Sequence, residues 1–171
     1  MELIVREATL ADVNNLAVLK QQVYISTLAI NGLIEEFSTY ILSEYSVKNV
    51  GESLKDVNIL TLLALYNNAL IGCVDILLNQ QCPILNIEPS IKISNFYILE
   101  RFQSIGIGQK LLGKCMEVIK QMNYKKVWLP VYYRNQQAID FYKRNNFIHI
   151  GEMDFVLGGN KYKNYIMIRD I

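Results

Sequence analysis

The chain has 171 residues, of which 51% are hydrophobic, 11% aromatic and 19% charged, a composition that excludes global disorder and suits one domain. Seventeen basic and sixteen acidic residues leave a formal net charge of +1, so no bulk field attracts nucleic acid. The one histidine, His149, leaves few ligands for a metal site, and we expect it to be an ordinary strand residue.

The N-terminus and the cysteines agree with a cytoplasmic protein. The first residues include an acid at once, Glu2, and no long apolar run, so we expect no signal peptide. No apolar stretch is long enough for a membrane-spanning helix. Cys73, Cys82 and Cys115 are odd in number and lack C-x-x-C spacing, so we expect them to be small core residues.

The first third of the chain predicts a short strand and two helices. Residues 3–5 begin the strand, and Thr9 with Asp12 indicates a helix start. A second helix is predicted over about residues 34–44 from its apolar spacing. Residues 46–56 are polar and are interpreted as a loop or a short helix.

Strands dominate the rest of the chain. Strands are predicted over residues 59–66, 69–78, 91–99, 126–131, 147–156 and 161–168, and helices over residues 107–122 and 135–144. Asn67 and Asn68 suit a tight hairpin turn, and residues 158–160 suit the last turn. The whole chain, residues 1–171, is therefore predicted to be a single mixed α/β domain.

A glycine-containing turn stands between a predicted strand and the long helix. Residues 103–110 include Gly106 and Gly108, and the helix begins there. Backbone N–H groups at such a junction, together with the helix dipole, form an anion site, most often for phosphate. From these residues alone, a loop that uses glycine only for its turn is the alternative.

Two phosphate-binding motifs do not fit this turn. A dinucleotide fingerprint requires a third glycine where Leu111 stands, and an acid about 20 residues further on, where Lys125 and Lys126 stand. A P-loop over residues 108–114 would need Ser or Thr next, and Cys115 stands there.

The segment Gln103-x-x-Gly106-x-Gly108 resembles the Q/R-x-x-G-x-G/A motif of the GNAT superfamily of acetyl-CoA-dependent N-acetyltransferases. A second block, residues 128–147, resembles the strand, N-x-x-A-x-x-F-Y helix and G-F ending of that superfamily, with Asn146 in place of the glycine. The spacing between the blocks and the order of predicted elements agree with the superfamily as well.

Within the superfamily, the C-terminal part is most similar to bacterial spermidine/spermine N-acetyltransferases. Residues 127–129, 141–143, 155–158 and 165–167 carry this similarity. Two acids that are frequent in that group are replaced by Ser94 and Asn164. The resemblance implies an amine acceptor, with a polyamine as one candidate.

The resemblance implies an α/β fold with a mixed, mostly antiparallel central sheet of six to seven strands, flanked by about four helices. It also implies a V-shaped splay between the fourth and fifth strands. Acetyl-CoA is the implied co-substrate, and no metal is expected. The residues expected to contact the coenzyme are Phe96, Tyr97, Ile98, Gln103, Ser104, Ile105, Gly106, Ile107, Gly108, Gln109, Asn135 and Lys143.

The resemblance also implies roles for these residues. Amides of residues 103–108 would hold the pyrophosphate, and pantetheine would lie between the strands near Tyr97 and Pro130. Tyr142 would be the general acid for the leaving thiolate, and Asn135 would bind pantetheine or cap its helix. The basic residues near this end, any of which could reach the 3′-phosphate, are Arg101, Lys110, Lys143 and Arg144.

The general base and the acceptor stay open at this point. The candidate bases are Asp75, Glu88, Glu100 and Glu152, and the acids that could attract a cationic amine are Glu35, Glu36 and Glu44. The expected activity is acetylation of a small-molecule primary amine; the alternatives are acetylation of a protein or peptide and non-catalytic CoA binding. The resemblance also allows for a homodimer, because many proteins of this superfamily pair through exposed strands.

Overall fold

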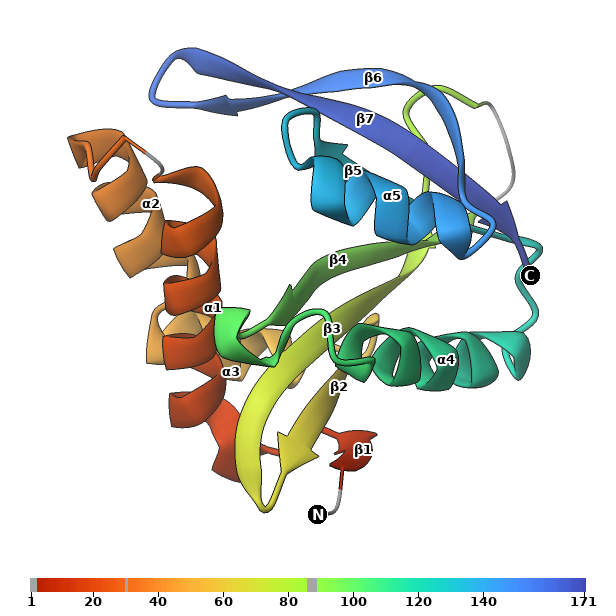
Figure 1. Ribbon diagram of the computed structural model, residues 1–171, viewed down its shortest axis with the longest axis horizontal. Helices are drawn as coiled ribbons and strands as arrows, with labels where there is room; N and C mark the ends of the chain where they lie inside the picture. Colours follow the sequence, from red (N-terminus) through yellow and green to blue (C-terminus); the bar gives the residue numbers. More distant parts are fainter. Residues whose placement is uncertain (1–2, 30, 86–88) are drawn as a thin grey trace.

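The computed structural model describes residues 3–29, 31–85 and 89–171 and contains one seven-stranded sheet of order β1-β2-β3-β4-β5-β7-β6 (Figure 1). The strands are β1 (Leu3–Glu7), β2 (Ile59–Tyr66), β3 (Ala69–Gln80), β4 (Ser90–Ile98), β5 (Lys126–Tyr132), β6 (Ile148–Leu157) and β7 (Asn160–Asp170). The helices are α1 (Val13–Leu28), α2 (Glu35–Glu44), α3 (Val47–Ser53), α4 (Ile107–Lys120) and α5 (Gln136–Arg144), with 3-10 turns η1 (Leu10–Asp12) and η2 (Glu100–Phe102). The expected fold class is confirmed, with one more helix among the described residues than expected.

The extra helix is α3, in the polar segment whose sequence left loop and short helix open. Ser46 caps it, because its Oγ accepts a hydrogen bond of 3.2 Å from the Asn49 amide. The buried Val50 anchors the helix on α1. A short helix with one apolar anchor has little periodicity, which is why the sequence did not decide it.

Both faces of the sheet are covered, and neighbouring residues on β2 and β3 point to opposite faces. Leu62 and Val74 pack in the cluster under α4, whereas Leu63 and Cys73 pack under α1 and α3. The long apolar runs of these strands therefore reflect burial on two faces. All three cysteines are buried and free.

The left-handed turn positions hold residues that tolerate them. Asn67 and Asn68 have φ of 48° and 65°, as the hairpin prediction requires. Asn146, where the superfamily pattern has glycine, has φ of 64°. Asparagine reaches this region more easily than other non-glycine residues, so the departure from the pattern preserves the backbone shape.

The sheet opens between β4 and β5. These strands are parallel and pair at Ile91 with Val127 and Lys92 with Trp128, and β4 then runs on to Ile98 without a partner on that side. Strand β5 pairs instead with β7 along its whole length. Pro130 lies beyond the last β4 pair, where its missing N–H costs no hydrogen bond to β4.

A bulge in β4 accompanies the opening. Cys73 pairs with Tyr97, but Asp75 pairs with Ser94, so β4 has one extra residue here. Asn95, within the bulge, has φ of 46°. Because a bulge bends its strand, β4 diverges from β5 beyond this point. None of the described helices has the length and apolar character needed to cross a bilayer.

Candidate active site

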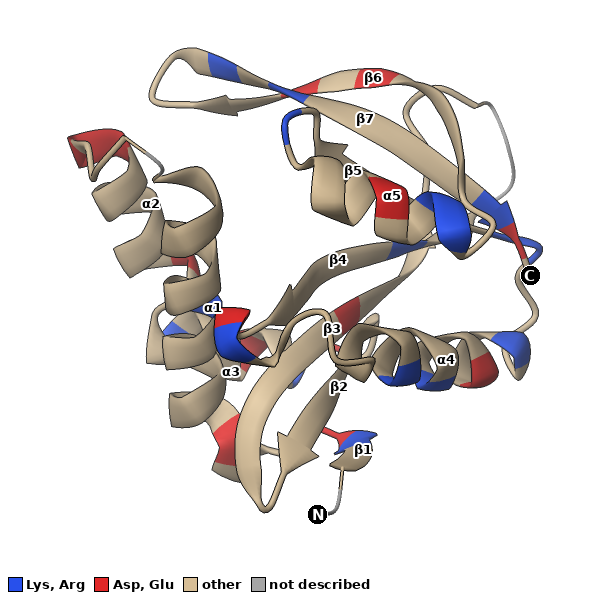
Figure 2. Cartoon of the chain, in the orientation of Figure 1, with Lys and Arg blue, Asp and Glu red and all other residues tan. Residues whose placement is uncertain are grey.

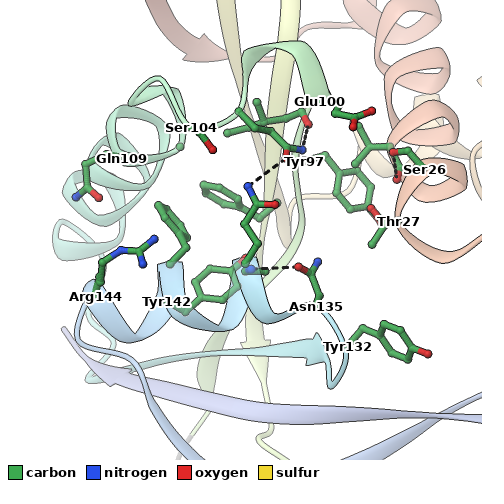
Figure 3. Close-up of a pocket in the computed structure, with 18 of the residues that line it drawn as sticks. Ser26, Thr27, Tyr97, Glu100, Ser104, Gln109, Tyr132, Asn135, Tyr142 and Arg144 are labelled. Atoms are coloured by element: carbon green, nitrogen blue, oxygen red, sulfur yellow. Dashed lines mark hydrogen bonds between the residues drawn. The ribbon is translucent and has the colours of Figure 1, made fainter. Parts of the chain in front are cut away.

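A cleft of about 610 Å³ lies where β4 and β5 diverge, bounded by the ends of α1, α4 and α5 (Figure 3). The expected site residues that line it are Phe96, Tyr97, Ile98, Gln103, Ser104, Gly106, Gly108, Gln109, Asn135 and Tyr142. Ile105, Ile107 and Lys143 do not line it. Ile105 points outward and is 67% exposed, and the Ile107 side chain is buried in the core.

The glycine turn forms one wall of this cleft. Ser104 and Gly106 have φ of 60° and 88°, and α4 begins directly after Gly106. Within this described segment, the amides of residues 104–109 donate to no backbone carbonyl. The Gln103 side chain donates to the Ile98 carbonyl at 2.9 Å and so attaches the turn to β4. Free amides at a helix start suit an anionic group such as a pyrophosphate.

Gly108 is needed for close packing at this wall. A Cβ at this position would lie 3.3 Å from the Ile98 side chain and 3.4 Å from the Phe141 ring. Any larger side chain would therefore push α4 away from β4 and α5.

Tyr142 lies on the opposite wall, in α5. Its side chain is 7% exposed, and its ring packs against Phe96 and Phe147 at centroid distances of 6.1 and 5.6 Å. Burial raises the pKa of the Tyr142 hydroxyl, so this group is protonated at neutral pH. The hydroxyl makes no hydrogen bond to any of the described residues, which leaves its proton available to a ligand.

The start and end of α5 show two further features of the site. Asn135 lines the cleft and also caps the helix, since its Oδ1 accepts a hydrogen bond of 3.1 Å from the Ala138 amide. At the other end, Arg144 rather than Lys143 lines the cleft. Neighbouring helical residues point about 100° apart, so the helix rotation decides which cation faces inward. Figure 2 shows both basic residues in the last turn of α5.

One wall comes from residues that the sequence did not single out. Val23, Ser26 and Thr27, near the end of α1, line the cleft, and Ser26 and Thr27 lie on the same side of it as Tyr97 and Glu100 (Figure 3). Their i, i+3 and i+4 spacing shows that they share a helix face. Only the packing of α1 against β4 brings that face to the cleft.

The candidate bases differ in whether they line the cleft. Glu100 is exposed and lines the cleft. Asp75 is buried in an ion pair with Lys20 at 2.6 Å, and Glu152 pairs with Lys163 at 2.9 Å on the last hairpin. Neither lines the cleft, so both are poor candidates for the base. Glu88 lies outside the described residues.

A second hollow of about 730 Å³ lies between α2 and the turn joining β6 to β7, lined by Glu35, Glu36, Tyr40 and Glu44 among others. Glu36 accepts hydrogen bonds from the Tyr162 hydroxyl and from the Asn160 amide, so its carboxylate holds the last hairpin against α2. This hollow contains neither the glycine turn nor Tyr142. The cleft is therefore the candidate active site.

His149 plays no part in the cleft. Its ring lies 4.4 Å from that of Tyr165, and its Nε2 lies 2.9 Å from the Gly151 carbonyl. Among the described residues, no three His, Cys, Asp or Glu side chains gather as metal ligands would.

Comparison with known proteins places this geometry in a family. The model of the acetyltransferase (GNAT) family matches residues 28–147, which include the glycine turn, the splayed strands and all of α5. The chain belongs to this family. It is therefore an acetyl-CoA-dependent acetyltransferase, as its resemblance to the GNAT superfamily implies.

Individual relatives are more distant. An uncharacterized N-acetyltransferase from Mycobacterium bovis is 23% identical over 137 residues, which are 80% of this chain and 83% of that protein. A spermine/spermidine N(1)-acetyltransferase from Bacillus subtilis is 33% identical over 64 residues, 37% of this chain and 42% of the relative. The crystal structure of PaiA N-acetyltransferase from Thermoplasma acidophilum in complex with coenzyme A has a TM-score of 0.80, 20% identity and full coverage of both chains.

Proposed function

We propose that this GNAT acetyltransferase transfers the acetyl group of acetyl-CoA to a primary amine of a small molecule, with polyamines among the candidate acceptors. One observation carries the proposal: a single cleft joins the glycine turn, Tyr142 and the polar end of α1. An anion site, a proton donor and a separate polar wall are what a two-substrate acyl transfer requires.

The cleft residues suit the coenzyme at successive points. The free amides of residues 104–109 suit the pyrophosphate, and Arg144 offers a cation for a further phosphate. The unpaired edge of β4 beyond Lys92 offers backbone groups to the amides of pantetheine. When bound, the coenzyme supplies an acetyl thioester.

Proton movements then define the roles of the side chains. An ordinary alkylamine is only about 0.04% neutral at pH 7, so the acceptor must lose a proton before it can attack the acetyl carbon. Glu100, the candidate base on the cleft, accepts that proton directly or through water. The new C–N bond replaces the C–S bond, and Tyr142 donates its hydroxyl proton to the departing sulfur. The nitrogen loses its second proton to the Tyr142 oxygen, directly or through water, which restores the hydroxyl.

The polyamine candidate rests on sequence similarity and on exposed acids. The 64-residue similarity to the Bacillus subtilis enzyme agrees with the resemblance of the C-terminal part. Glu35 and Glu44 are exposed beside the second hollow, where they would attract a polycation. The replacements at Ser94 and Asn164 are reasons to test other amines in parallel.

An acceptor screen tests the proposal. Thiol release from acetyl-CoA is followed with spermidine, spermine, simple alkylamines, amino acids, and peptides with free N-termini or lysines. We expect turnover with at least one small primary amine at higher kcat/KM than with any peptide. Turnover with peptides alone would reassign the acceptor class, and heat stabilisation by acetyl-CoA without any turnover would indicate a binding protein.

A further inference from the structure

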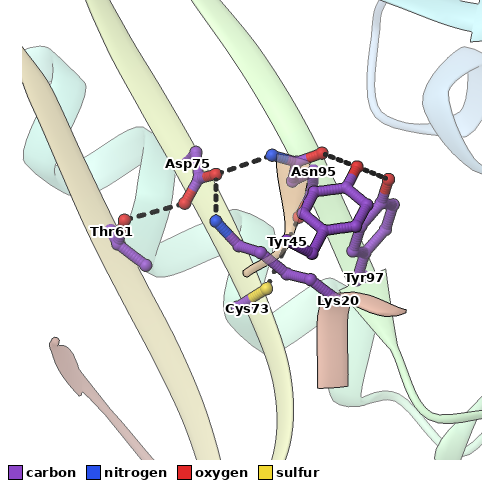
Figure 4. A network of polar contacts seen from close by, with 7 residues as sticks. All are labelled: Lys20, Tyr45, Thr61, Cys73, Asp75, Asn95 and Tyr97. Carbon is purple, nitrogen blue, oxygen red and sulfur yellow. Dashed lines mark hydrogen bonds and ion pairs between the residues drawn. The ribbon is translucent and has the colours of Figure 1, made fainter. Parts of the chain in front are cut away.

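A chain of hydrogen bonds connects a buried ion pair to the cleft (Figure 4). Lys20 donates to Asp75 Oδ2 at 2.6 Å, Thr61 donates to Asp75 Oδ1 at 2.7 Å, and the Asn95 amide nitrogen donates to Asp75 Oδ2 at 2.8 Å. Beyond Asn95, the Tyr45 hydroxyl donates to Asn95 Oδ1 at 3.1 Å and lies 3.0 Å from the Tyr97 hydroxyl. Tyr97 lines the cleft.

The ion pair determines the direction of every bond in this chain. An ionised carboxylate only accepts hydrogen bonds, so the NH₂ group of Asn95 must face Asp75 and its oxygen must face Tyr45. The Tyr45 proton is then committed to Asn95. Only the Tyr45 oxygen remains for Tyr97, so the Tyr97 hydroxyl must donate to Tyr45.

These hydrogen-bond directions require the hydroxyls of both Tyr45 and Tyr97 to be protonated. Burial raises the pKa of Tyr45, and burial likewise raises the pKa of Tyr97, so both hydroxyls are protonated at neutral pH. Each hydroxyl has one proton, and each proton is used within the chain. The Tyr97 oxygen therefore has lone pairs, but no proton, left for a ligand.

Tyr97 lies on the α1 side of the cleft. Phe96 packs against Phe141 and Tyr142 on the α5 side, whereas the Tyr97 ring packs among residues of α1 and α2. Phe96 and Tyr97 follow the bulge at Asn95, and both lie on the part of β4 that borders the cleft. The coenzyme wall and the Tyr97 hydroxyl are thus on different faces of the sheet.

We propose that Tyr97 is a specificity-determining residue whose oxygen accepts an N–H hydrogen bond from the acceptor amine, in a direction set by Asp75, Asn95 and Tyr45. The inference deepens the proposed function and rests on it. A neutral primary amine has two N–H groups: one proton leaves during the reaction, and the other stays on nitrogen and can donate to Tyr97. An N-methylated secondary amine has a single N–H, which leaves, so nothing remains for Tyr97.

The test compares primary amines with their N-methylated counterparts. The probes are butane-1,4-diamine with N,N′-dimethylbutane-1,4-diamine, benzylamine with N-methylbenzylamine, and Nα-acetyllysine amide with its Nε-methyl derivative. The pair with the highest wild-type turnover is used at saturating acetyl-CoA. We expect Tyr97→Phe to reduce the preference for the primary amine about three- to tenfold, the range for one lost hydrogen bond, with an unchanged Kd for acetyl-CoA.

Tyr45→Phe tests the direction of the hydrogen bonds in this network and does not remove a group that contacts the amine. The Tyr97 hydroxyl then loses its acceptor and can turn its proton toward the cleft, so the preference should also shrink. Tyr124→Phe is the matched control, because its hydroxyl donates to Asn79 at 2.8 Å and does not line the cleft. It should leave the preference unchanged, and melting temperatures show that all three variants fold.

The outcomes separate the two proposals. Turnover of a primary amine with the same preference in wild type and Tyr97→Phe would overturn the role of Tyr97 alone. A reduced preference in Tyr97→Phe but not in Tyr45→Phe would overturn the directional part. No turnover of any of the three primary amines, with acetyl-CoA still bound, would overturn the proposed function and this inference with it.

Discussion

Tyr142 illustrates how a residue acquires a role from its surroundings. Its ring is held by Phe96, Phe141 and Phe147, so the hydroxyl has a fixed place on the wall of the cleft. Burial raises its pKa, so the hydroxyl still carries its proton at neutral pH. The same apolar shell that stabilises the core therefore also positions the hydroxyl that we propose as the proton donor.

Replacing Tyr142 by Phe keeps this ring packing and removes only the hydroxyl. We expect kcat to fall by about 10²- to 10⁴-fold, the usual contribution of a general acid, with little change in the Kd for acetyl-CoA. Steady-state kinetics and calorimetric titration measure the two quantities. Full activity in Tyr142→Phe would mean that water or another group protonates the sulfur.

Lys20 and Asp75 form the most buried ion pair of the described residues, with side-chain exposures of 3% and 4%. Asp75→Asn would leave the Lys20 ammonium buried without its counter-ion, and we expect a loss of about 3–5 kcal/mol in the free energy of unfolding. Urea denaturation measures this loss. As a control, Glu52→Gln breaks an exposed pair with Lys55 and should cost no more than about 1 kcal/mol.

The pH dependence of this pair has a definite sign. Burial lowers the pKa of Lys20, but the charge and hydrogen bond of Asp75, together with other neighbouring groups, raise it by more, so the pKa ends above the ordinary 10.5. A base with a raised pKa contributes stability that is fully present below its ordinary pKa and is lost as pH rises through the raised value. The stability difference between wild type and Asp75→Asn should therefore be constant near neutral pH and shrink above about pH 10.5.

At the scale of an element, α4 combines a core helix with a binding turn. Its buried face includes Leu111, Leu112 and Cys115, which fix the helix on the sheet, and its first amides are left free at the cleft. Gly106 provides the φ of 88° that directs the chain into the helix. The position of the proposed anion site therefore depends on the packing of the rest of the helix.

Gly106→Ala tests the effect of the backbone conformation alone, because an added Cβ there has no atom within 4 Å to clash with. The left-handed conformation alone should cost about 1–2 kcal/mol and weaken acetyl-CoA binding. Gly113→Ala is the matched control: it lies in the same helix, its Cβ also meets nothing within 4 Å, and it should stabilise by about 0.5–1 kcal/mol. Melting temperatures and calorimetric Kd values compare the two variants; equal binding in both would contradict the role of the turn.

At the scale of the whole molecule, the cleft exists because the sheet does not close. Strands β4 and β5 share two paired positions, and the bulge at Asn95 and the long pairing of β5 with β7 hold their ends apart. The unpaired edge of β4 therefore offers backbone hydrogen-bonding groups to an extended ligand.

A ligand that fills this opening should stabilise the folded state. At 100 times its Kd, acetyl-CoA should add about 2.7 kcal/mol to the free energy of unfolding and raise the melting temperature by about 5–10 °C. Thermal scans over a range of acetyl-CoA concentrations measure the shift, with adenosine alone as the control. A melting temperature that is independent of acetyl-CoA would contradict the assignment of the cleft.

Most elements and the glycine turn could be predicted from the sequence, because the signals are local. Residues 59–66 form β2 within the predicted bounds, and Asn67 and Asn68 make the predicted turn. Apolar spacing, turn residues and short motifs depend on neighbours within a few positions, so the sequence by itself determined the strands, the long helix, the turn and the resemblance to an acetyltransferase.

Only the tertiary structure decided which distant side chains meet. Helix rotation brought Arg144, not Lys143, to the cleft, and the docking of α1 added Ser26 and Thr27 to its wall. The hydrogen bonds that lead from Lys20 to Tyr97 connect α1, β3, β4 and the end of α2, which are far apart in the sequence. Such contacts depend on the relative positions of packed elements, and local patterns carry no information about those positions.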